Sequence, residues 1–93
     1  MPHSAGDEFS ALKNRTEQNL IEFLRVEADL ASTFCTLAET TENPQHRAEL
    51  LGNIRKAASA IWHFEPRIAD PSAREELLQK ADELDQFLAE ISS

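Results

Sequence analysis

The residues best suited to chemistry stand close together in the stretch AIWHFEP, residues 60–66. It holds the chain's one tryptophan, Trp62, beside one of its three histidines, His63. A histidine can serve as a phosphoacceptor or as a metal ligand, and both roles need further groups at helical spacing. The neighbours of His63 four residues away are Ser59 and Arg67, neither of which is a metal ligand. We therefore expect a solvated His63, with no catalytic residue, no metal and no cofactor.

Glu27 is the second candidate, because it falls near the middle of an apolar helix face. An ionised carboxylate in such a place is costly unless it is hydrogen-bonded or paired. Two interpretations stay open. Glu27 is either a tuned acid/base or ligand-binding group, or a structural carboxylate. In the structural case its partner is the indole N–H of Trp62 or the guanidinium of Arg47, Arg55 or Arg74.

Cys35 is the chain's one cysteine, and it lies on the same apolar face. A single cysteine cannot form an intrachain disulfide, which favours a reducing compartment. With no basic neighbour in sequence, Cys35 is expected to be a small packing residue. The sequence contains no Gly-rich phosphate loop, nucleophile elbow or Cys/His cluster. It therefore predicts that the protein is not an enzyme.

Helices must position these residues, because strand signals are nearly absent. Asn43-Pro44 and Asp70-Pro71 each combine an Asx N-cap with a proline at the first helical position. Pro66 disfavours the α conformation at the residue before it, which predicts a helix end there. The predicted elements are a mobile tail at residues 1–7 and helices at about residues 8–42, 44–65 and 71–91.

Short connections make sequential helices antiparallel, so residues 1–93 are predicted to form a single all-α domain, an up-down-up three-helix bundle. The first helix is over-long, running about 50 Å against about 30 Å for each of the others. Residues 10–19 contribute only Ala11 and Leu12 as apolar side chains. We expect this segment to overhang the bundle, where it either frays or pairs with a second copy of the chain.

Helical periodicity, about 100° per residue, assigns each side chain a face. On the second helix the apolar seam comprises Leu50, Ile54, Ala57, Ile61, Phe64 and Ile68. Trp62 lies beside this seam and is either a core residue or an anchor for a partner, and core is the favoured interpretation. Phe87 points away from the seam of the third helix, which comprises Leu77, Ala81, Leu84, Leu88 and Ile91. We expect Phe87 to be partly exposed.

The first helix has the widest apolar face, a sector of roughly 200°. A face of this width is typical of a helix that packs against two neighbours at once, and we expect that of this helix. Its members are Leu20, Ile21, Leu24, Val26, Leu30, Ala31, Phe34, Cys35 and Leu37.

The net charge of −8 argues against nucleic acid as a partner, because phosphate binding needs a basic surface. No apolar run approaches the ~18 residues of a membrane span, so no membrane association is expected. The N-terminus shows no basic and apolar leader, and we expect a cytoplasmic protein. The acidity favours solubility and also leaves room for a basic partner.

Residues 34–62 resemble one helical hairpin of the tetratricopeptide type. The positions that match that motif are Phe34, Leu37, Ala38, Ile54 and Ala57, and those that depart from it are Thr41, Leu50 and Trp62. The predicted three-helix arrangement is also similar to microtubule-interacting and trafficking domains, which bind partner helices in a groove between helices. Both resemblances imply an α-helical scaffold that binds other proteins.

We expect a non-enzymatic interaction module that binds a partner helix or a second copy of itself. The candidate contact residues are Trp62 and Phe87, together with Leu12 and Phe9 on the overhang. The alternative is a regulatory bundle that binds a small molecule or a metal through Glu27.

Overall fold

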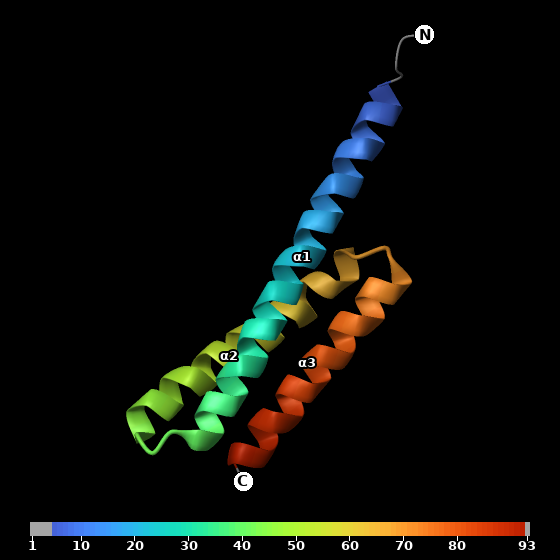
Figure 1. Cartoon of the computed structure of the whole chain (residues 1–93). Coiled ribbons are helices and arrows are strands. Elements are labelled where there is room, and N and C mark those ends of the chain that lie inside the picture. Colours follow the sequence, from blue (N-terminus) through green and yellow to red (C-terminus); the bar gives the residue numbers. More distant parts are fainter. Residues whose placement is uncertain (1–4, 93) are drawn as a thin grey trace.

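The computed structural model describes residues 5–92, with side chains from residue 15 to residue 91. It contains three α-helices, α1 (Ala5–Thr40), α2 (Pro44–Phe64) and α3 (Pro71–Ser92), and one 3₁₀ turn, η1 (Glu65–Arg67). Figure 1 shows α2 returning along α1, and α3 returning past both. The described residues contain no strand. The chain is therefore an all-α, antiparallel up-down-up bundle with an over-long first helix, as the sequence predicts.

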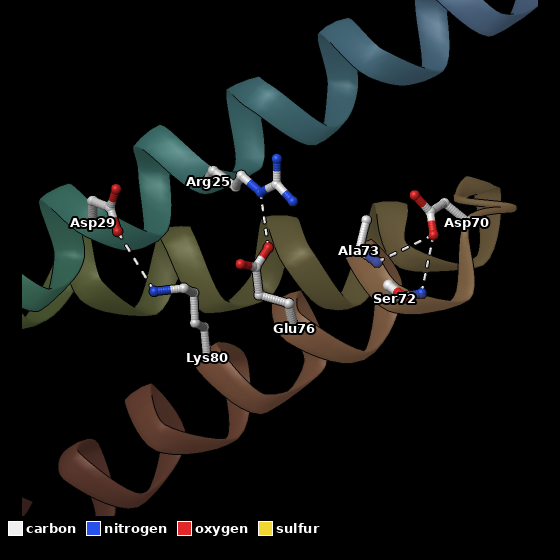
Figure 2. Close-up of polar contacts among 7 residues, drawn as sticks. All are labelled: Arg25, Asp29, Asp70, Ser72, Ala73, Glu76 and Lys80. Carbon is white, nitrogen blue, oxygen red and sulfur yellow. Dashed lines mark hydrogen bonds and ion pairs between the residues drawn. The ribbon is translucent and has the colours of Figure 1, made fainter.

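Both predicted Asx caps form. The Asn43 Oδ1 accepts the backbone N–H groups two and three residues further on, at 2.9 and 3.2 Å. The Asp70 Oδ1 does the same at the start of α3, at 3.0 and 3.5 Å (Figure 2). Pro44 and Pro71 follow as first helical residues, where a missing N–H leaves nothing unsatisfied. These caps fix where α2 and α3 begin.

The ends of α1 and α2 have different causes. Arg47, from the first turns of α2, donates to the carbonyls of Ala38 at 3.2 Å and Thr41 at 2.6 Å. These carbonyls lie at the end of α1, where no intrahelical donor remains. Glu65 keeps the α conformation, so the predicted effect of Pro66 on the residue before it is absent. The regular helix ends at Phe64 because Pro66 has no N–H to donate to the carbonyl four residues before it, and the chain continues as η1.

The core lies along the inner faces of the three helices in two contiguous clusters. On α2 it contains the predicted seam, with Ile54 and Ile61 fully buried and Phe64 half-buried. From α1 it takes small residues as well as large ones, since Ala28 and Ala31 are each 1% exposed. Small side chains on α1 let a neighbouring helix approach closely.

Two ion pairs and a loop contact tie α1 to the segment after α2. Arg25 pairs with Glu76 at 2.8 Å, and Asp29 pairs with Lys80 at 3.5 Å (Figure 2). Further up the helix, the Glu17 Oε1 accepts the N–H groups of the two residues before Pro71. Glu17 thereby marks where the bundle begins along α1.

The N-terminal part of α1 projects beyond the other two helices (Figure 1). The helix starts at Ala5, so the predicted tail at residues 1–7 is wrong for its last three residues, and residues 1–4 lie outside the described part. At ~1.5 Å per residue, its 36 residues extend about 54 Å, whereas the 21 of α2 extend about 32 Å. The overhang predicted at residues 10–19 is therefore present only in part, because Glu17 already contacts the loop before α3. We call residues 5–16 the overhang.

Candidate functional site

The exposed apolar surface of the molecule lies mainly on α1. Phe23 is 51% exposed, Val26 63%, Leu30 47% and Leu37 42%. We call these four residues the outer row. As predicted, α1 packs against both neighbouring helices. Only part of its wide apolar face takes part in this packing, because Val26, Leu30 and Leu37 keep much of their surface in water.

The geometry of the bundle explains this division. The residues of α1 that face the core are Ile21, Leu24, Ala28, Ala31 and Ala38. Both α2 and α3 cover this side, and the outer row lies roughly 150° around the helix from it. The hydrophobic pattern alone does not show on which side the third helix packs, because both flanks of the face are apolar. Phe23 was missed for this reason, although its spacing of three and seven residues from Val26 and Leu30 is a detectable signal.

Acidic residues border the outer row on both sides. Glu22 and Asp29 lie on one side of it, and Glu27 lies on the other. The Asp29 carboxylate pairs with Lys80 at 3.5 Å, a longer distance than the 2.8 Å between Arg25 and Glu76. The Asp29 side chain remains 75% exposed, so its carboxylate is accessible to a further cation. An apolar row between acidic borders suits an apolar helix face that is flanked by basic residues.

Glu27 is not a core carboxylate. Its side chain is half-buried, and among the described residues no polar or charged side chain is buried. No hydrogen bond or ion pair joins Glu27 to another described residue. Three of the four predicted partners are engaged elsewhere: Trp62 donates to Asp85, Arg74 pairs with Glu65, and Arg47 donates to carbonyls at the end of α1. The carboxylate reaches the helix edge and needs no internal partner there.

Glu27 instead lines a hollow of about 240 Å³ between α1 and α2. Leu30 and Phe34 contribute apolar side chains to it, and Lys56 lies on its α2 side. The hollow continues the outer row toward α2 through Leu30, which belongs to both. A docking helix could therefore place a large side chain here, with a basic group beside Glu27.

Trp62 is 44% exposed, so the favoured interpretation of it as a core residue is wrong. Its indole N–H donates to the Asp85 carboxylate at 2.8 Å, which places the ring along the α2–α3 edge rather than between α1 and α2. Ile61, the preceding residue, is fully buried. The ring is therefore held by one polar contact while much of its surface faces water.

The other candidates have different outcomes. His63 is exposed, as predicted, and meets the Phe64 ring edge-on with centroids 4.7 Å apart. Phe87 is half-buried, so it is partly exposed as predicted, and it packs against the second core cluster. Leu12 and Phe9 belong to α1, but their side chains lie outside the described residues.

Cys35 is half-buried and carries a free thiol. Burial raises the pKa of this thiol above its ordinary value, and the nearby Glu39 carboxylate raises it further. A raised pKa keeps the group as the unreactive thiol at neutral pH. Cys35 is therefore suited to packing rather than to nucleophilic chemistry.

The described residues contain no group of three or more His, Cys, Asp or Glu that could hold a metal ion. None of the helices in the described part of the chain is long and apolar enough to cross a membrane. The fold and this surface define an all-α three-helix bundle with an open apolar row on its longest helix. The chain matches no protein-family model, no curated protein and no solved structure.

Proposed function

We propose that the protein is a non-enzymatic interaction module that docks an α-helix along the outer row of α1. The observation that carries this proposal is the exposure of four large apolar side chains, between 42% and 63%, on one helix face. Contiguous apolar surface of this kind is characteristic of binding sites. A docked helix would remove the row from water, which stabilises a complex by roughly 25 cal/mol per Å² of apolar area.

An amphipathic peptide tests this proposal directly. The peptide carries Leu on one helical face and Lys beside it, which complements the acidic borders of the row. We expect ¹⁵N NMR titration to shift the backbone resonances around Phe23, Val26 and Leu30. A scrambled peptide of the same composition is the control. If only resonances on α3 move, or none do, the docking surface is wrongly assigned.

A second candidate function uses the hollow beside Glu27. A carboxylate and the Lys56 ammonium line a space of about 240 Å³ with apolar walls, a combination that suits a small zwitterionic or polar organic molecule. One carboxylate beside a lysine is a poor donor set for a metal. Thermal-shift screening of metabolites against wild type and Glu27→Gln checks this candidate, which predicts stabilisation of the wild type only.

A further inference from the structure

The outer row is one part of a heptad pattern that runs along most of α1. Alternating steps of three and four residues connect positions that are all apolar or uncharged. These positions are Phe9, Leu12, Thr16, Asn19, Phe23, Val26, Leu30, Thr33, Leu37 and Thr40. In heptad notation, Phe9 and every seventh residue after it occupy position a, and Leu12 and every seventh residue after it occupy position d. A pattern of four or more heptads is typical of a coiled coil.

We infer that the helix docked on this stripe is α1 of a second copy of the chain, running antiparallel to the first. This inference rests on the proposed function and names its partner. The occupant must be a long helix, because the heptad stripe spans most of a helix of 36 residues. A twofold symmetric pair of α1 helices meets this requirement, because one stripe then covers an identical one.

The charges beside the stripe select the antiparallel orientation. Positions e and g flank the core positions of a coiled coil. Lys13 and Glu27 both occupy position e, and Arg15 and Asp29 both occupy position g. In an antiparallel pair, e faces e and g faces g. Lys13 then meets Glu27 of the second copy, and Arg15 meets Asp29 of the second copy.

Both contacts occur in the same register, and symmetry repeats each of them, which makes four ion pairs. In this register Leu12 packs against Leu30 of the second copy, and Asn19 against Phe23 of the second copy. The Glu27 carboxylate, which has no partner within the described residues, gains a cation from outside. One unfavourable contact remains, because the Glu22 residues of the two copies face each other at the twofold axis.

The competing arrangements have worse electrostatics. In a parallel pair, position g of one helix faces position e of the next heptad on the other. Glu22 then opposes Glu27 of the second copy, twice, and this cancels the two attractive contacts of Glu8 with Lys13. An antiparallel register shifted by one heptad in one direction places Glu22 against Asp29 of the second copy, twice. The opposite shift places Arg15 against Glu22 but also Glu8 against Asp29, each twice, so its charges cancel. Like charges in these positions suppress the wrong pairing.

The arrangement also gives the overhang of α1 a structural role. The N-terminal residues of α1 project beyond the bundle (Figure 1). They carry two of the three basic residues of α1, Lys13 and Arg15, while the acidic borders of the row lie further along the helix. Each overhang also carries Asp7 and Glu8, so its net charge is zero, but this register places its two basic residues beside the acidic borders of the other copy's row.

Sedimentation equilibrium of the full chain between about 1 and 500 µM tests the inference, because this interval covers the dissociation constants of a dimer in the micromolar range. We expect a monomer–dimer equilibrium that weakens as salt rises. Leu30→Lys should be a monomer throughout this range. Because Leu30 is 47% exposed, this variant keeps its fold, which circular dichroism verifies. A wild type that stays monomeric overturns the inference.

Charge exchange then tests the orientation. Glu27→Lys should raise the dimer dissociation constant about tenfold, because two attractive contacts become repulsive. The double variant Lys13→Glu, Glu27→Lys should restore it to within about threefold of wild type. Glu75→Lys, the same change in charge at an exposed site on α3, is the control and should have little effect. In a parallel dimer Glu27→Lys strengthens association instead, and that result also contradicts the inference.

These outcomes separate the two proposals. A monomeric wild type whose outer row still binds the Lys-flanked peptide disproves self-association and leaves the docking surface in place. A wild-type dimer that Leu30→Lys does not affect also disproves the inference, because the row then has no part in self-association, and the peptide titration alone decides the docking proposal.

Discussion

Neighbouring residues in the stretch from Ala60 to Pro66 have unrelated environments. Ile61 is fully buried, Trp62 is 44% exposed and donates to Asp85, and His63 faces solvent. Successive residues of a helix point about 100° apart, so adjacency in sequence does not gather side chains into a site. The side chains of this stretch point in different directions around one helix, and their environments range from fully buried to solvent-exposed.

This contrast predicts different effects of mutation at neighbouring positions. Ile61→Ala should lower the free energy of unfolding by about 2–4 kcal/mol, because it leaves a cavity in a fully packed site. His63→Ala should change it by less than about 0.5 kcal/mol, because the ring is exposed. Urea denaturation followed by circular dichroism measures both. Equal effects at the two positions would contradict the assignment of faces.

Trp62 and Glu27 are the residues whose roles the tertiary contacts changed. Each was expected in the interior, and each reaches the edge of a helix instead. Trp62 gains an acceptor from α3, whereas Glu27 faces the hollow beside the outer row. The bundle consequently holds no internal carboxylate among its described residues, and its polar groups act at its surface.

At the level of elements, the helix boundaries come from local chemistry. An Asx cap with a following proline starts α2 and α3, and Pro66 stops α2. These signals act within a few residues, so they are readable without the fold. The end of α1 is different, because Arg47 of the next helix covers its last carbonyls.

The caps give a second prediction. Asn43→Ala should reduce the free energy of unfolding by about 1 kcal/mol, because two N–H groups at the start of α2 lose their acceptor. Asn43→Ser keeps an oxygen at the same position and should recover most of this loss. Chemical denaturation of the three proteins measures the difference. No loss in the alanine variant would show that the cap does not stabilise α2.

The ion pairs between α1 and α3 contribute less than the packing around them. In the Arg25–Glu76 pair both side chains are nearly half exposed, at 47% and 44%. Exposed pairs stabilise a fold by about 0–1 kcal/mol, whereas a single buried leucine contributes more than that. These pairs orient α3 along α1, and the buried apolar residues hold it there.

At the scale of the whole molecule, α1 has one buried face and one exposed apolar face. Its inner face completes the core, and its outer row remains open along the length of the bundle. The overhang carries the helix beyond the ends of α2 and α3 (Figure 1). The molecule is therefore an elongated rod, 64 by 19 by 16 Å, rather than a closed sphere.

The overhang leads to a third prediction. A short helix without tertiary contacts is marginally stable in water. In the monomeric Leu30→Lys variant, amides in residues 5–16 should therefore exchange with solvent at least about a hundredfold faster than those in residues 20–38. Hydrogen exchange read by NMR or mass spectrometry measures this. Equal protection of both segments would show that the overhang is stable without a partner.

The fold could be predicted because its determinants are local. Helical periodicity identifies the seam from Leu50 to Ile61, the Asx-Pro pairs place two helix starts, and short connections make the helices antiparallel. The candidate site could be predicted only in part. Exposure of His63 follows from its angle to the core, and the projection of the overhang follows from the length of the first helix, but the outer row does not follow from either.

Sequence by itself determined the number of helices, their boundaries to within a few residues and the over-long first helix, because caps, prolines and periodicity act through the nearest turns of the chain. Tertiary structure alone decided which flank of the apolar face of α1 is covered. Both flanks are apolar, so the choice depends on where α3 packs after its loop, and that placement results from contacts between residues far apart in the chain, such as Arg25 with Glu76. The same choice left Phe23, Val26, Leu30 and Leu37 in water.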